Sequence, residues 1–381
     1  MKPGMILSAV LSLAVFAALN LYLGWNGAVF WREAIPGVPV GWFWLGYGIL
    51  ALSYIAAMLL RKALPYTLGK WLKIIGSYGL AILFYMVILV PLADLAYGVL
   101  RLSGVERSPA LLYTGWTTAV ILAGVMLAGT RNAWKPVVRH YELEVPKACG
   151  DGRKELRIAA ASDIHLGAIV GNPHLVRLAN TMDKLKPDVI LLAGDVLDDS
   201  LEPFVRENMA RSMKLLRAPL GVYASLGNHE YYGGHIGEYI RRMKDIGIKV
   251  LTDQVVDVEG SFYIAGRKDR AAEQIEAGGR LSVGQLLSEA DPERPVILMD
   301  HQPYALQTAA EAGVDLMLSG HTHRGQMAPA HLVTRRLFEL DWGYLKKGAM
   351  HVIVSSGFGL WGPPIRLGSR SEILDIRLKF I

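Results

Sequence analysis

Side chains that can bind metal ions follow several short apolar runs in the C-terminal half of the sequence. The runs are 156–161, 188–193, 221–226, 295–299 and 314–318. The polar side chains just beyond their ends are Asp163, His165, Asp195, Asn228, His229, His301, His321 and His323. They include five of the ten histidines, a concentration that unrelated structural histidines would not produce. Imidazole, carboxylate and amide groups without a thiolate suit Mn, Fe or Zn at a reactive centre better than a structural zinc site.

The runs that precede these side chains have the length and composition of buried strands. Helical patterns separate several of them, at 173–184, 202–216 and 236–246. Strands that alternate with helices predict sheets flanked by helices, with functional side chains at the carboxyl ends of the strands. Later runs at 255–265 and 351–355 predict a second sheet. The expected fold of this half is therefore an α/β (α+β) sandwich of two sheets flanked by helices.

Five motifs in this region follow one another in an order that resembles a known family. They are DIH (163–165), GD (194–195), GNHE (227–230), His301 and GHTH (320–323). Over about residues 155–381 this order resembles the calcineurin-like metallophosphoesterases. The longer strings GNHEYYGG, SGHTHRGQ and GFGLWGPPIR look most like the membrane-associated bacterial subgroup.

The resemblance implies a centre of two divalent metal ions that share one ligand. One ion would be held by Asp163, His165 and His323, and the other by Asn228, His301 and His321. Asp195 would bridge them, since a carboxylate can bind two cations and an imidazole cannot. Such a pair clamps a phosphoryl group and lowers the pKa of a water molecule. The resemblance therefore implies phosphoester hydrolysis by a metal-bridging hydroxide, with Mn expected and Fe or Zn as alternatives.

His229 is the expected general acid of this reaction. It follows the ligand Asn228 without being a ligand itself, and it would protonate the leaving oxygen or stabilise its developing charge. Asp198 lies three residues after the bridging carboxylate, where some members of the family keep an acid that orients this histidine. The alternative for Asp198 is a solvated loop acid.

Two arginines are candidates for binding the substrate phosphate. Arg324 directly follows the last metal motif, where many relatives have glycine, and its alternative is an ion pair at the rim. Arg366 ends a glycine-rich loop that the family places near the active site, and its alternative is a packing role in that loop. Asp199 stands where the phosphoprotein-phosphatase branch has a phosphate-binding arginine, which argues against a phosphoprotein substrate.

The N-terminal third is apolar enough to be a membrane domain. The stretches 5–23, 41–60, 74–100 and 111–129 reach the length of ~20 residues that a helix needs to cross a bilayer. We expect four transmembrane helices in residues 1–131, a linker in 132–154 and a catalytic domain in 155–381. The first stretch could instead be a cleaved signal peptide. Small residues at Gly76, Gly79, Gly115 and Gly124 suit close helix contacts within or between chains.

Basic residues between the stretches set the expected orientation. One side collects Lys2, Arg61, Lys62, Lys70, Lys73, Arg131, Lys135 and Arg139, and the other collects Arg32, Arg101 and Arg107. The richer side is expected in the cytoplasm, which predicts an inner-membrane protein with a cytoplasmic catalytic domain. Loss of the first stretch would not change the side of the C-terminus. The single cysteine, Cys149, excludes an intrachain disulfide.

Three functions are compatible with these features. The first is hydrolysis of a phosphorylated or pyrophosphate-containing lipid at the cytoplasmic leaflet. The second is a phosphodiesterase for a small soluble substrate, with the helices as an anchor. The third is a non-catalytic metal-dependent sensor or scaffold. The basic membrane flanks account for the net charge of +6, and no basic-aromatic stripe is present, so no nucleic-acid partner is expected. The oligomeric state is left open.

Overall fold

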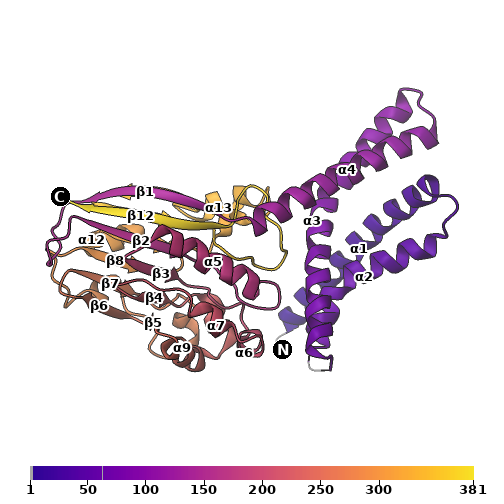
Figure 1. Cartoon of the computed structure of the whole chain (residues 1–381). Coiled ribbons are helices and arrows are strands. Elements are labelled where there is room, and N and C mark those ends of the chain that lie inside the picture. Colours follow the sequence, from indigo (N-terminus) through magenta and orange to yellow (C-terminus); the bar gives the residue numbers. More distant parts are fainter. Residues whose placement is uncertain (1–2, 62) are drawn as a thin grey trace. The chain divides into compact units, whose positions relative to one another are not determined.

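The computed structural model describes residues 3–61 and 63–381, which form two compact units (Figure 1). Unit 1 contains the described residues up to Thr130 together with Gly362–Ile365. Unit 2 contains Arg131–Trp361 and Arg366–Ile381. Lys2 and Lys62, which contribute to the predicted orientation, lie outside the described residues.

Unit 1 is built from long helices, as predicted. They are α1 (Pro3–Ala34), α2 (Val40–Leu59), α3 (Tyr66–Leu102) and α4 (Arg107–Trp134). All four are long and apolar enough to cross a membrane, judged by length and composition. Helix α3 has 37 residues and therefore spans about 55 Å at 1.5 Å per residue, well beyond the ~30 Å hydrocarbon core. Its extra turns precede the predicted stretch and contain Lys70 and Lys73, which are compatible with the headgroup region.

Helices α2 and α3 approach each other closely at two glycines. A Cβ atom on Gly76 would lie 2.2 Å from the backbone nitrogen of Tyr54, and one on Gly79 would lie 2.3 Å from the carbonyl oxygen of Leu50. Only glycine permits this spacing, which is typical of helix contacts in lipid. Gly124 has no neighbouring atom within 4 Å of such a position, so its predicted close contact is not found among the described residues.

Unit 2 contains two six-stranded sheets, which confirms the predicted fold class. The first has the order β1-β12-β2-β3-β4-β5 and the second β10-β11-β9-β8-β7-β6. The strands of the first sheet are β1 (Val137–Val145), β12 (Glu372–Phe380), β2 (Glu155–Ala161), β3 (Val189–Ala193), β4 (Val222–Ser225) and β5 (Ile248–Leu251). Those of the second are β10 (Gly343–Lys347), β11 (Met350–Val354), β9 (Leu316–Ser319), β8 (Val296–Met299), β7 (Phe262–Gly266) and β6 (Gln254–Val258). Strand β1 lies within the predicted linker.

Helices cover the sheets of unit 2. They are α5 (Asn172–Leu185), α6 (Leu201–Arg206), α7 (Met209–Met213), α8 (Asn228–Gly233), α9 (Ile236–Asp245), α10 (Ala272–Ile275), α11 (Val283–Leu286), α12 (Leu306–Glu311) and α13 (His331–Leu337), with the 3₁₀ turn η1 (His323–Gly325). The single helix predicted at 202–216 is divided into α6 and α7. Asn208 causes the break because it adopts a left-handed conformation with φ 50°, which an α-helix cannot contain.

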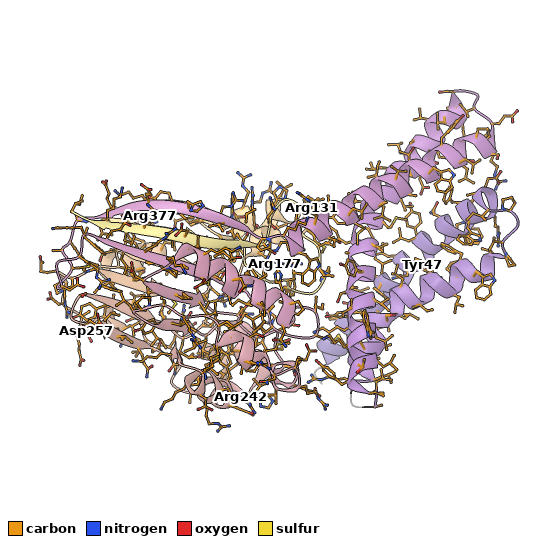
Figure 2. All side chains as sticks on the ribbon, viewed as in Figure 1. Tyr47, Arg131, Arg177, Arg242, Asp257 and Arg377 are labelled. Carbon is orange, nitrogen blue, oxygen red and sulfur yellow. The ribbon has the colours of Figure 1, made fainter. Side chains whose placement is uncertain are left out.

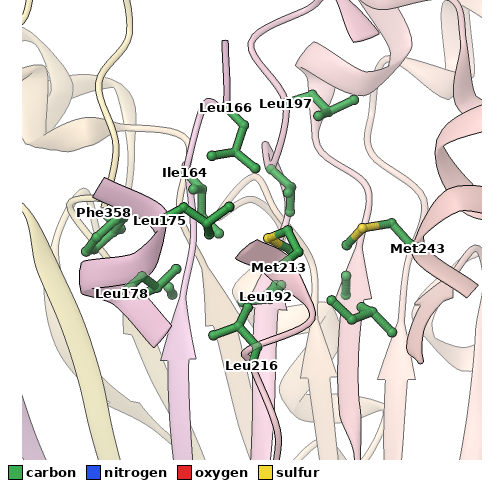
Figure 3. Close-up of a cluster of buried hydrophobic side chains, with 14 of the residues drawn as sticks. Ile164, Leu166, Leu175, Leu178, Leu192, Leu197, Met213, Leu216, Met243 and Phe358 are labelled. Atoms are coloured by element: carbon green, nitrogen blue, oxygen red, sulfur yellow. The ribbon is translucent and has the colours of Figure 1, made fainter. Parts of the chain in front are cut away.

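The core of unit 2 lies on both faces of the first sheet. In β2, Ala159 and Ala161 face the cluster beneath α5, while Leu156 and Ile158 face the second sheet. This alternation follows from the two-residue period of a strand. Leu175 of α5 packs into the same cluster, which also includes Leu178, Leu192 and Met213 (Figure 3).

Polar side chains such as Arg177 and Asp257 are exposed at the surface of unit 2 (Figure 2). The first sheet, in contrast, has an apolar cluster on each face. Burial of both faces accounts for the nearly continuous apolar runs in the sequence.

Candidate metal centre

The loops after five strands bring together the predicted metal-binding side chains. The loops follow β2, β3 and β4 of the first sheet and β8 and β9 of the second. Neighbouring parallel strands end at the same edge of a sheet, so the side chains on these loops converge. Three overlapping groups have donor atoms within 4.8 Å of one another. The groups are Asp163, His165, His323; Asp195, His301, His321; and His165, Asp195, His229.

The first two groups correspond to the two halves of the predicted centre. The side-chain oxygen of Asn228 lies 2.9 Å from Nδ1 of His321 and so belongs with the second group. Asp195 lies between the halves, since its Oδ2 is 3.0 Å from Nε2 of His301 and 3.9 Å from Nε2 of His165. The arrangement is a binuclear-type His/Asp metal site, and the assignment of each ligand to one ion stays a prediction.

The donor atoms are spaced as ligands of cations would be. Nε2 of His165 and Nε2 of His323 face each other at 3.0 Å, and Oδ1 of Asp163 lies 3.5 Å from Nε2 of His323. Two neutral imidazole lone pairs repel at this distance unless a proton or a cation separates them. All three side chains are buried. A metal ion among them therefore fits the residues present.

The backbone at these positions adopts conformations that residues other than glycine rarely take. Five predicted ligands have a positive φ, namely Asp163 (50°), His165 (50°), Asp195 (51°), His321 (69°) and His323 (48°). Each such residue costs of order 1–3 kcal/mol, and these conformations concentrate at functional sites. Hydrogen bonds hold the turns in place, since the N–H of Asp163 donates to Gly194 and the N–H of His321 donates to Asp163 Oδ1.

Two motif glycines leave room for the carboxylate ligands. A Cβ atom on Gly227 would lie 2.1 Å from Oδ1 of Asp195, and one on Gly320 would lie 2.1 Å from Oδ2 of Asp163. Neither position can accept a larger residue without displacing a ligand. The glycines of the GNHE and GHTH motifs are therefore part of the site's geometry.

Glu230 connects two loops of the centre, a role that the sequence analysis did not assign. Its Oε2 accepts hydrogen bonds from the N–H groups of Asp195 (3.1 Å) and Gly227 (2.7 Å), and its Oε1 accepts one from Leu197 (2.8 Å). The side chain is 2% exposed. Burial, followed by the charge of Asp195, raises the pKa of Glu230 to about 7, while the N–H groups oppose this shift. The signal in the sequence was an acid at the third position of a helix that begins after Gly227.

The carboxylate that contacts His229 is that of Asp199, the residue after the predicted Asp198. Its Nδ1 lies 2.7 Å from Oδ1 of Asp199, which leaves Nε2 on the side of Asp195, 4.0 Å from Oδ2. Asp199 adopts a left-handed φ of 54°, which turns its side chain toward the histidine. Burial lowers the pKa of His229, but the hydrogen bond to Asp199 and the charge of Asp195 outweigh it and raise this pKa to about 9. An orienting role for Asp198 stays a prediction.

The protonation states of His165, His321 and Asp195 suit metal binding. Burial lowers the pKa of His165 and of His321 to about 4, so both imidazoles are neutral and offer a lone pair. Burial raises the pKa of Asp163 to about 6. For Asp195 burial acts in the same direction, but the charge and hydrogen bond of His301 outweigh it and lower the pKa. The predicted bridging position thus holds a carboxylate that stays ionised.

The two candidate phosphate-binding arginines have different surroundings. Arg366 is fully buried, and its guanidinium donates to the carbonyls of Ser356 (2.6 Å) and Gly359 (2.7 Å) and lies 3.2 Å from Nδ1 of His323. These contacts favour the packing alternative. The Arg324 guanidinium lies 4.0 Å from the centre of the Trp342 ring and is partly exposed. A phosphate contact by either arginine stays a prediction.

Comparison with known proteins identifies the family. Residues 156–325 match the model of the calcineurin-like phosphoesterases. An uncharacterized metallophosphoesterase of Aquifex aeolicus is 32% identical over 246 residues, which cover 64% of this chain and 91% of that protein. A transmembrane protein with metallophosphoesterase domain from Danio rerio is 29% identical over 368 residues, 91% of this chain and 83% of that protein. A match of this length extends well into the four helices. The chain belongs to the calcineurin-like metallophosphoesterases, with a binuclear-type His/Asp site and four helices able to span a membrane.

Proposed function

We propose that this metallophosphoesterase hydrolyses a phosphorylated or pyrophosphate-containing lipid at the cytoplasmic leaflet, as a member of the membrane-associated bacterial group. The observation that carries the proposal is the presence of four candidate spans in the same chain as a binuclear-type His/Asp metal site. One span would be enough to anchor a soluble enzyme. Three more suggest that the membrane is where the substrate is found.

The side chains of the centre divide the work of hydrolysis. Its donor atoms would hold two divalent cations, which supply an activated water and neutralise phosphoryl charge. Manganese suits the oxygen and imidazole donors. Asp195 lies between the two donor groups and keeps its negative charge. His229, held at Nδ1 by Asp199, presents Nε2 to the same region and can pass a proton to the leaving oxygen.

The predicted topology places this chemistry in the cytoplasm. Eight basic residues flank one side of the spans and three flank the other, and cytoplasmic loops carry the excess of Lys and Arg. Cytoplasmic leaflets also contain phosphorylated lipid headgroups, so orientation and substrate class are consistent with each other.

A soluble phosphodiester is the second candidate, and one comparison favours it. The match to the Aquifex aeolicus relative covers 91% of that protein but only 64% of this chain. Little of that protein is left to form four spans. If the relative is active without such spans, the chemistry does not require them, and they would serve as an anchor.

The experiment that separates these functions uses the full chain, purified in detergent and supplied with Mn²⁺. Release of phosphate or headgroup is measured on a panel of phosphorylated lipids and on a panel of soluble phosphodiesters. Asp195→Asn and His229→Ala serve as inactive controls. Hydrolysis of lipids alone, lost in both variants, is the expected result. Hydrolysis of soluble diesters alone would contradict the lipid substrate, and bound metal without turnover on either panel would support a non-catalytic sensor.

A further inference from the structure

Helix α13 carries an apolar face that unit 2 does not bury. Leu332, Val333 and Leu337 are 54%, 57% and 65% exposed, and no residue of α13 is buried. No other helix lying wholly in unit 2 exposes three large apolar side chains among the described residues. Arg335 and Arg336 on the same short helix are also exposed. We call these five residues the α13 patch.

The polar side of α13 faces the domain, which is the reverse of a core helix. The Thr334 hydroxyl donates to Oδ2 of Asp341 (2.7 Å). His331 packs beside Gly325: a Cβ atom added to Gly325 would lie 2.4 Å from the backbone nitrogen of His331. These contacts fix the helix with its leucines outward. An apolar face with flanking arginines is the composition of a helix that lies in a membrane interface.

Hydrogen bonds within unit 2 tie the α13 segment to the end of a candidate span. The N–H of Ala328 donates to Leu367 (2.7 Å). Further along the same loop, the Ser371 hydroxyl donates to the carbonyl of Ala133 (2.6 Å), and Arg370 donates to that of Lys135 (2.9 Å). Ala133 belongs to the last turn of α4. The loop that is bonded to the α13 segment therefore contacts the last turn of α4.

An exposed tryptophan lies on the same loop. Trp361 is 58% exposed, and its backbone N–H donates to the buried Gln326 (3.0 Å), three residues beyond the metal motif. Ile365, which belongs to unit 1, lies against Gly129 of α4. A Cβ atom added to Gly129 would lie 3.0 Å from the Cβ atom of Ile365. Tryptophan is enriched at the headgroup level of membranes, so its place on this loop agrees with an interfacial position.

We propose that the α13 patch and Trp361 dock the catalytic domain on the headgroup layer of a membrane that contains anionic phospholipid. The apolar side chains enter the interface, and Arg335 and Arg336 pair with lipid phosphates. Each basic residue close to an anionic surface strengthens binding about fivefold. Phe338, the residue after α13, packs 6.0 Å from the ring of His321, so docking brings the membrane surface beside the metal centre. The docking goes beyond the proposed function, because it is expected whichever phosphoester is hydrolysed.

A fluorescent probe on α13 tests this docking. In a Cys149→Ala background, Val333→Cys is labelled with an environment-sensitive dye and the full chain is reconstituted into phosphatidylcholine vesicles with or without phosphatidylglycerol. Ile275→Cys, on α10, is the matched control because Ile275 is similarly exposed, at 54%. We expect a blue shift at position 333 that is larger in the anionic vesicles, and none at position 275. Arg335→Gln with Arg336→Gln should weaken docking about 25-fold.

Three results would overturn the proposal. One is an equal response of the two labelled positions. Another is an equal response of position 333 in neutral and anionic vesicles. The third is a blue shift in detergent that grows with protein concentration, which would assign the patch to a second copy of the chain. The amount of Mn²⁺ bound per chain in detergent should be unchanged in the double arginine variant, which shows that its metal centre is intact. A failure to hydrolyse lipids would contradict the proposed function and leave the dye result unaffected.

Discussion

Substitution of Glu230 by glutamine tests whether the metal centre depends on one buried carboxylate. Oε2 accepts two backbone N–H groups and Oε1 accepts a third. The glutamine oxygen can replace Oε2, but its NH₂ group then faces the N–H of Leu197, and two donors meet in a buried site. An unpaired buried donor costs about 1–3 kcal/mol, and the two remaining bonds lose their charge assistance, about 0.5–1 kcal/mol each. We therefore expect a loss of about 2–5 kcal/mol in the stability of unit 2.

The same change should also slow hydrolysis. Glu230 fixes the loop of Asp195 to the turn that begins at Gly227, and a misplacement of about 1 Å at a reacting centre can cost on the order of 10²-fold in rate. Thermal unfolding in detergent and turnover of whichever phosphoester the parent protein hydrolyses measure the two effects. Glu238→Gln is the control, since Glu238 is partly exposed and pairs only with Arg242 among the ion pairs of the described residues. Equal stability and turnover in the two variants would refute the reasoning.

Three further predictions follow from the packing of named residues. Gly227→Ala should abolish hydrolysis and metal retention, because its Cβ would lie 2.1 Å from the carboxylate of Asp195; Gly284→Ala, with nothing within 4 Å, should change neither. Gly76→Val should lower the thermal stability of the helices in detergent, whereas Gly124→Val should not; equal effects would contradict the proposed contact. The pKa of buried His174 is lowered by burial to about 4, so the unfolded chain binds its proton first and stability falls as the pH drops from 6.5 to 4. Between pH 6.5 and pH 4, the free energy of unfolding of His174→Phe should rise by up to ~3 kcal/mol relative to that of the parent protein. A difference between the two proteins that stays constant over this pH range would contradict the prediction.

The strand ends of the catalytic domain were predictable because their signal is local. A short apolar run followed by Asp or His indicates a buried strand and a metal ligand within about six residues, and each of the five loops has this form. Strand β12 had no comparable signal. It pairs in parallel with β1 and antiparallel with β2, and only the three-dimensional arrangement brings these distant segments together.

The residues that support the ligands were harder to predict than the ligands. Glu230 and Asp199 were visible as acids, but their roles depend on turns whose geometry the sequence does not display. Asp199 reaches His229 because its own backbone is left-handed. Arg366 was expected near the site, and it is fully buried there among carbonyl groups. Side-chain type indicated which residues could do chemistry, and packing determined which of them reach the centre.

The most direct test of a two-metal phosphoesterase is a metal titration of the full chain after removal of bound ions by a chelator. Hydrolysis of a soluble or lipid phosphoester, whichever is turned over, is followed as Mn²⁺ is added in known amounts, together with the bound metal per chain. We expect the rate to reach its plateau at two equivalents, and Asp195→Asn to lose both the second ion and the activity. A plateau at one equivalent, or two bound ions without hydrolysis, would contradict the account.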